Sequence, residues 1–240
     1  KENKAGRPMS GSGAAESATC PGWWERSKRR ASLCLLAFGD SLTAGCHDDG
    51  MAFTPWAPIL KERLHIGGAA HIGCSGWTTG QLLAAVDEPL GTSSDVFGRR
   101  WPGLRHQLRS SPFALVIIMA GTNDLADRVQ PQEIVHNLAA FHRIAHDAGA
   151  RTVAMTVPES AAAAHVPWLG ALRKQTNVAI AAWARAQPSD LVLFVDAAAL
   201  VPWAPGRFWE ADGLHMSAEG YQKFGERLAH AIDAFVDGSN

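Results

Sequence analysis

Five apolar runs of strand length divide the chain and alternate with longer segments of helical periodicity. The runs are apolar at consecutive positions, as in LCLLAF and ALVIIMA, which is typical of strands buried on both faces of a parallel sheet. We predict strands at 33–38, 69–73, 114–120, 151–157 and 191–195. The segments between them predict helices at about 55–65, 79–86, 131–148, 167–187 and 217–236.

The helical assignments rest on apolar stripes and on residues that begin or end helices. Pro131 begins the third predicted helix and Gly149 follows its end, and its apolar positions recur every three or four residues. Thr78 or Thr79 is expected to cap the second. Strands that alternate with helices of this length predict a three-layer α/β/α domain around a parallel sheet.

The first 30 residues differ from the rest of the chain. Residues 1–20 are rich in Gly, Ala, Ser and charge and lack apolar periodicity. We therefore predict a flexible basic N-terminal tail over 1–30 and a single domain over 31–240. Trp23 and Trp24 are expected to pin the end of the tail, and we interpret the Lys-Arg-Arg run at 28–30 as solvated charge rather than a targeting or phosphate patch.

Composition excludes several classes of protein. With 47% hydrophobic and 19% charged residues, the chain resembles an ordinary soluble globular protein. Its net charge of -1 gives no reason to expect a nucleic acid or an anionic membrane as partner. No apolar run approaches the roughly 20 residues that cross a bilayer, so we expect no integral membrane segment. The chain does not begin with Met, so we expect the native N-terminus to be missing, and compartment and oligomeric state stay open.

Polar residues follow the first three predicted strands, at the edge of a parallel sheet where active sites lie. Ser41 comes directly after the first strand, in Gly39-Asp40-Ser41-Leu42-Thr43. A serine hydroxyl is a weak nucleophile until a base removes its proton, so a serine hydrolase also needs a nearby histidine. Taken alone, Ser41 is equally well explained as a helix cap.

A base and an orienting acid occur together near the C-terminus. In Asp212-Gly213-Leu214-His215 the spacing lets the carboxylate reach one ring nitrogen while the other faces Ser41. The alternative is that Asp212 and Ser217 cap the last helix and that His215 is a surface residue.

Oxyanion donors are expected on the two other strand ends. The amide of Asn123, in Gly-Thr-Asn-Asp after the third strand, can donate to a developing oxyanion. The backbone N–H of Gly76, in Ser-Gly-Trp-Thr-Thr after the second, is a further donor. Each is also explained as a simple turn residue.

Together these four segments, in this order, resemble the four sequence blocks of the SGNH (GDSL-type) hydrolase superfamily, over roughly residues 33–236. The resemblance implies a flavodoxin-like sheet and a carboxylic ester hydrolase. It also implies that Ser41 is the nucleophile, His215 the general base and Asp212 its orienting acid, with an oxyanion hole from Ser41, Gly76 and Asn123. The α/β-hydrolase elbow Gly-x-Ser-x-Gly is absent, because Thr43 stands where its second glycine would be.

Other signals carry less weight. His142 and His146 have the spacing of a zinc pair but lack the glutamate of the metalloprotease motif, and Asp48-Asp49-Gly50 lacks the remaining ligands of a calcium loop. We therefore expect no metal and no cofactor. Cys46 and Cys74 should lie near each other beside the site, and two free buried thiols are expected rather than a disulfide.

Nine tryptophans are an unusual number, and five fall in segments near the predicted site. We expect most of them to pack in the core, and we predict that Trp77 contacts substrate because it adjoins Gly76. The others in this group are Trp56, Trp168, Trp203 and Trp209.

The residues thus predict a cofactor-free esterase that acts on a small-molecule, lipid or sugar ester. Acyl transfer, and thioester or lysophospholipid hydrolysis at the same site, remain alternatives. A non-catalytic binding module on the same fold is a third hypothesis, which intact Ser41, Asp212 and His215 disfavour.

Overall fold

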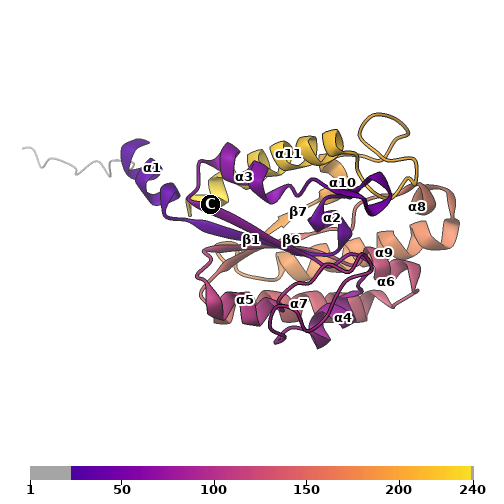
Figure 1. The fold of residues 1–240 in the computed structure, drawn as a ribbon, viewed down its shortest axis with the longest axis horizontal. Helices are drawn as coiled ribbons and strands as arrows, with labels where there is room; N and C mark the ends of the chain where they lie inside the picture. The colour runs from indigo at the N-terminus through magenta and orange to yellow at the C-terminus, as the bar shows by residue number, and fades with distance from the viewer. Residues whose placement is uncertain (1–22, 239–240) are drawn as a thin grey trace, which may run out of the picture.

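The computed structural model describes residues 23–238. Its centre is a sheet of five parallel strands in the order β4-β1-β5-β6-β7 (Figure 1). The strands are β1 (Cys34–Gly39), β4 (Gly68–Gly73), β5 (Leu115–Met119), β6 (Arg151–Met155) and β7 (Val192–Val195). Taken in chain order, this is the 2-1-3-4-5 arrangement of flavodoxin-like folds. All five predicted strands are confirmed.

Helices cover both faces of the sheet and complete three layers (Figure 1). One face carries α3 (Ala57–Leu64), α10 (Ala197–Leu200) and α11 (Ala218–Val236). The other carries α4 (Thr79–Ala84), α5 (Leu104–Ser110), α7 (Pro131–Asp147) and α9 (Pro167–Arg185). The predicted α/β/α architecture is confirmed, and so are the five predicted helices, within a few residues at their ends.

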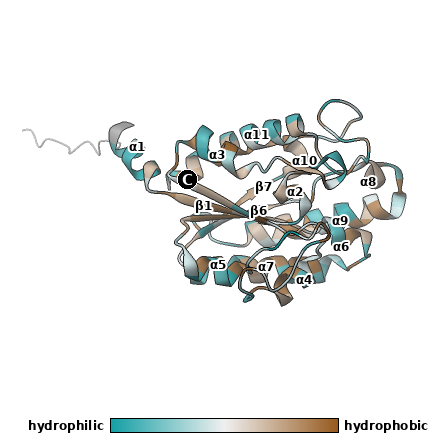
Figure 2. Cartoon of the chain, viewed as in Figure 1, coloured by the Kyte–Doolittle hydropathy of each residue, from teal (hydrophilic) through white to brown (hydrophobic). Residues whose placement is uncertain are grey.

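The two core clusters explain why the strand sequences are apolar throughout. Leu35 and Ala37 of β1 pack under α3 and α11, whereas Leu36 and Phe38 pack under α4 and α7. Because successive side chains point to opposite faces and both faces are covered, no position in the strand can be polar without cost. Figure 2 shows the hydrophobic colour concentrated on the sheet and the hydrophilic colour on the outer sides of the helices.

Short elements that the sequence patterns did not predict gather around the carboxyl edge of the sheet. They lack enough residues for a periodic apolar stripe, so periodicity cannot reveal them. They are α2 (Ser41–Ala44), the antiparallel ribbon of β2 (Cys46–His47) and β3 (Ala52–Phe53) with the 3-10 turn η1 (Asp48–Gly50), α6 (Thr122–Ala126), α8 (Ala161–His165) and α10.

The C-terminal part of the predicted flexible tail is helical. Residues 23–31 form helix α1 (Trp23–Ala31), and Arg30 is buried rather than solvated. Its guanidinium donates two hydrogen bonds of 2.7 Å to Asp237 and one of 3.1 Å to the Leu64 carbonyl. Asp237 thus joins the helix to the end of α11. The rest of the predicted tail, residues 1–22, lies outside the described residues, as do the side chains of Trp23 and Trp24.

No helix in the described part of the chain has the length and hydropathy that a membrane-spanning helix requires.

We predict that Arg30→Ala destabilises the protein by about 2 kcal/mol, because the buried Asp237 carboxylate loses two hydrogen bonds and keeps only Arg26 as an ion-pair partner. Arg29→Ala, which changes the exposed neighbour in the same helix, should alter the free energy of unfolding by less than about 0.5 kcal/mol. Urea denaturation of both variants measures the difference. Equal effects would show that the helix contributes no stability through this ion pair.

Candidate active site

The register of the sheet brings three predicted site segments to one edge. Gly39, the last residue of β1, lies level with Gly73 at the end of β4 and with Met119 at the end of β5. The loops that follow these three strands therefore begin side by side. The edge lies at the switch point of the sheet, where chain connections diverge to opposite sides.

Ser41 is held at the start of the short helix α2. The Asp40 carboxylate accepts a 3.0 Å hydrogen bond from the Leu42 N–H, which caps this helix. Two residues on, the Thr43 hydroxyl donates to the carbonyl of Met119 at 3.1 Å. A Cβ at Gly39 would lie 1.8 Å from that same carbonyl oxygen, so only glycine permits this approach. Asp40 is therefore the cap of this helix, and Ser41 is its first helical residue, so the alternative in which Ser41 serves as the cap is wrong.

Asp40 is almost fully buried, at 1% exposed. Burial raises its pKa to about 6, although hydrogen bonds from the Leu42 and Thr122 N–H groups act in the opposite direction. The Thr122 bond, at 3.4 Å, links the loop after β1 to the loop after β5. Asp40 therefore positions two loops of the site, a role that the sequence reasoning missed although the residue stands within the Ser41 segment.

His215 lies between Ser41 and Asp212. Its Nε2 is 3.0 Å from the Ser41 Oγ, and its Nδ1 is 2.7 Å from the Asp212 Oδ2. The other carboxylate oxygen of Asp212 accepts hydrogen bonds from the backbone N–H groups of Leu214 and His215, at 2.8 and 3.0 Å. The structure thus brings together the serine, the histidine and the aspartate that the sequence predicted as a set.

The protonation pattern follows from the surroundings of Asp212. Burial raises the pKa of this carboxyl, but the hydrogen bonds from Leu214 and His215 outweigh burial and hold the pKa below its usual value. An ionised carboxylate only accepts hydrogen bonds, so the hydrogen between the two side chains belongs to Nδ1 of His215. In the neutral ring Nε2 then lacks a hydrogen and can accept one from the Ser41 hydroxyl.

Ser217 rather than Asp212 caps the last helix. Its hydroxyl accepts a 3.1 Å hydrogen bond from the Gly220 N–H at the start of α11. The reading in which both residues cap the helix is therefore wrong for Asp212, whose two oxygens are directed to the loop and to His215.

Gly76 and Asn123 lie on the neighbouring loops. Gly76 has a φ of +78°, which favours glycine, and it is exposed. Asn123 donates through Nδ2 to the carbonyl of Trp77 at 2.8 Å. An amide nitrogen carries two hydrogens, so this bond orients the side chain and leaves one N–H for a ligand.

A second buried carboxylate joins these same loops. Asp124 accepts a 2.8 Å hydrogen bond from the Thr79 N–H and another from the Thr79 hydroxyl. Asn137 of α7 donates to that hydroxyl at 3.1 Å. The loop after β4 is therefore fastened to the loop after β5 at the residue that follows Asn123. In the sequence, this contact is signalled by the aspartate that ends Gly-Thr-Asn-Asp.

The two histidines with the spacing of a zinc pair share one hydrogen-bonding partner. His142 and His146 both hydrogen-bond the Thr152 hydroxyl, at 2.7 and 3.0 Å, and burial lowers the pKa of His142 to about 3. No group of potential metal ligands occurs among the residues that the structure describes. Cys46 and Cys74 are free and buried, as predicted, and burial raises the pKa of their thiols to about 11 and 12.

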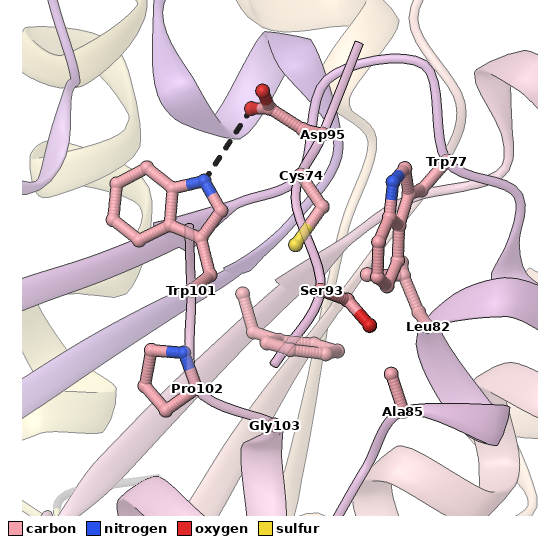
Figure 3. Close-up of a pocket in the computed structure, with 10 residues that line it drawn as sticks. Cys74, Trp77, Leu82, Ala85, Ser93, Asp95, Trp101, Pro102 and Gly103 are labelled. Atoms are coloured by element: carbon pink, nitrogen blue, oxygen red, sulfur yellow. Dashed lines mark hydrogen bonds between the residues drawn. The ribbon is translucent and has the colours of Figure 1, made fainter. Parts of the chain in front are cut away.

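Most of the five tryptophans near the predicted site are buried or half-buried, as expected. Trp56 and Trp209 are buried and donate to backbone carbonyls, and Trp203 is half-buried against the core. Trp168 is 43% exposed and carries the Arg128 guanidinium over its ring. Trp77 is half-buried and lines a narrow cavity (Figure 3).

The sheet order and the flanking helices define the SGNH hydrolase fold, which three solved structures share. A carbohydrate esterase family 3 protein from Talaromyces cellulolyticus is 16% identical, with a TM-score of 0.63 over 87% of this chain and 100% of its own. A Clostridium thermocellum family 3 carbohydrate esterase is 17% identical, with a TM-score of 0.62 over 85% and 97%. A lipase/acylhydrolase from Enterococcus faecalis is 22% identical, with a TM-score of 0.59 over 84% and 96%.

The sequence itself matches the model of the GDSL-like lipase/acylhydrolase family over residues 37–223. The match spans most of the chain, so the protein belongs to this family, as the four sequence blocks predicted. No match is found among curated proteins. Family membership supports an enzyme that hydrolyses esters.

We predict that Asp40→Asn becomes more stable, relative to the unaltered protein, as pH rises from 4 to 7. Folding raises the pKa of the Asp40 carboxyl from 3.8 to about 6, so the folded protein binds this proton more tightly than the unfolded chain does. Its stabilising contribution is therefore complete below pH 3.8 and is lost as pH rises through 6. The asparagine keeps an oxygen for the Leu42 N–H but does not ionise.

Urea denaturation at both pH values measures the change, which should be on the order of 2–3 kcal/mol. A difference between the two proteins that is independent of pH would contradict the raised pKa.

Proposed function

We propose that the protein hydrolyses carboxylic esters through an acyl-enzyme on Ser41. The observation that carries this proposal is the continuous chain of hydrogen bonds from Ser41 through His215 to Asp212, with distances of 3.0 and 2.7 Å. These are the contacts that a serine nucleophile, its base and an orienting acid require.

In the first step Ser41 Oγ attacks the ester carbonyl carbon while His215 Nε2 takes the hydroxyl proton. The tetrahedral intermediate collapses, the C–O bond to the alcohol breaks, and the imidazolium returns its proton to the leaving oxygen. In the second step a water loses its proton to the same nitrogen and attacks the acyl carbon. The acid departs, and the proton returns to Ser41.

Asp212 stabilises the imidazolium that forms in both steps. Its carboxylate is held by two backbone N–H groups, and its lowered pKa keeps it ionised at neutral pH. It accepts from Nδ1 throughout, so His215 stays in the tautomer whose Nε2 faces the serine.

The backbone N–H groups of Ser41 and Gly76 and the side-chain amide of Asn123 form the proposed oxyanion hole. Two of its three members come from loops that are fastened together, because Asn123 donates to the Trp77 carbonyl next to Gly76. Donors held in position before reaction stabilise the developing negative charge without reorganisation.

Ser41→Ala should abolish hydrolysis of p-nitrophenyl acetate, because no other group in the proposed mechanism supplies a nucleophile. The matched control is Ser110→Ala, an exposed serine at the end of α5, which should retain full activity. A fluorophosphonate probe should label the unaltered protein at Ser41 and should not label the Ser41→Ala variant. Undiminished hydrolysis by folded Ser41→Ala protein would overturn the mechanism.

Asn123→Ala should lower kcat by about 10²–10³-fold, equivalent to roughly 2.7–4 kcal/mol of barrier, with little change in KM. Asn177→Ala is the control, because Asn177 also exchanges hydrogen bonds with a loop backbone, that of Val157, at 2.8 and 2.9 Å. It should reduce stability without this loss of kcat. Equal losses of kcat in both variants would assign Asn123 a purely structural role.

A further inference from the structure

Exposed apolar side chains are concentrated on two loops, one of which places Val96 against Gly76 of the proposed oxyanion hole. Six large apolar side chains are exposed in the part of the chain whose side chains the structure describes, and four of them belong to two neighbouring loops. These four are Met51 at 83%, Leu90 at 67%, Val96 at 68% and Phe97 at 43% exposed. Isolated exposed apolar residues need no explanation, but a group on neighbouring loops does.

The loop that carries Val96 and Phe97 is built around a buried carboxylate. Asp95 is 5% exposed and accepts hydrogen bonds from the Phe97 and Arg99 N–H groups at 3.0 and 2.9 Å. It also accepts from the Ser75 N–H at 3.3 Å and from the Trp101 indole at 3.4 Å (Figure 3). The exposure of the two apolar side chains is therefore a consequence of an ordered loop and not of a poorly packed one.

Val96 lies directly against Gly76. A Cβ at Gly76 would be 2.5 Å from one Val96 methyl group, and the Val96 N–H donates to the Ser75 carbonyl at 3.2 Å. Any ester whose carbonyl oxygen is bound by the Gly76 N–H therefore has Val96 as a near neighbour.

Phe97 continues the same surface towards the β2–β3 ribbon. Its ring lies on Gly50, where a Cβ would be 2.1 Å from a ring carbon, and it meets Phe53 edge to face at 6.0 Å. Met51 follows Gly50. The Arg99 guanidinium is stacked on the Phe53 ring at 3.7 Å. We call Met51, Val96 and Phe97 the apolar rim.

The inner side of this loop is closed to an acyl chain. A cavity lies there between Trp77 and Trp101, with Cys74 and Leu82 in its wall (Figure 3). Its free volume is about 10 Å³, which admits roughly one water molecule. An acyl group on Ser41 that extends past Gly76 on this side of the site meets the outer surface, which is the apolar rim.

We propose that the apolar rim binds the hydrocarbon chain of the acyl group and gives the enzyme a preference for esters of medium-length fatty acids. This inference rests on the proposed esterase function. The three side chains offer methyl, thioether and phenyl groups and no strong hydrogen-bonding group, which suits a hydrocarbon chain and not a hydroxyl-bearing sugar. Each methylene that is removed from water favours binding by up to about fourfold.

The test compares kcat/KM for p-nitrophenyl octanoate and p-nitrophenyl acetate. In the unaltered protein the octanoate should be preferred by at least about tenfold. Val96→Ser and Met51→Ser should each lower this preference about threefold, and Val96→Leu should preserve it. The matched control is Val178→Ser on α9, which removes the same groups from a valine that is 70% exposed elsewhere, and it should leave the preference unchanged.

Each result bears on a distinct claim. If hydrolysis depends on Ser41 but the octanoate is not preferred, or if Val96→Ser behaves like Val178→Ser, the assignment of the apolar rim is wrong and the esterase mechanism stands. If neither ester is hydrolysed, or if Ser41→Ala retains activity, the proposed function is wrong. The assignment of the apolar rim as an acyl-binding surface is then wrong as well.

Discussion

The parallel pairing of β1 with β4 and β5 is the constraint on which the site depends. It ends three strands at the same level, at Gly39, Gly73 and Met119, and so starts three loops side by side. Ser41, Gly76 and Asn123 are far apart along the chain and become neighbours only through this register. A one-residue slip would turn every strand side chain to the opposite face and separate both core clusters from their helices, so the core that stabilises the fold also fixes the site.

Three buried carboxylates then convert adjacent loops into one rigid edge. Asp40 holds the loop after β1 to the loop after β5, and Asp124 holds the loop after β5 to the loop after β4. Asp95 organises the loop that places Val96 against Gly76. Each accepts several N–H or O–H donors, which is what a buried acidic group needs to offset the loss of water. The preorganised donors of the proposed oxyanion hole depend on these contacts.

The predictable part of the fold was the part with long, regular patterns. The five strands and five of the helices follow from apolar runs, apolar stripes and capping residues, and the parallel sheet follows from their alternation. The short helices, the ribbon and helix α1 did not. Arg30 illustrates the reason: beside Lys28 and Arg29 it reads as one more solvated charge, and only Asp237, 207 residues away, makes it a buried anchor.

For the site, the sequence by itself determined the residue types and their local spacing. Asp212 and His215 are three residues apart, so their contact is local, and the four blocks identify the family. Only the tertiary structure decided what meets across the chain: the 3.0 Å contact of His215 with Ser41, 174 residues away, and the position of Val96 against Gly76. Such contacts depend on how loops without periodicity fold onto a common edge, and that path is set by buried hydrogen bonds between distant residues rather than by local preference.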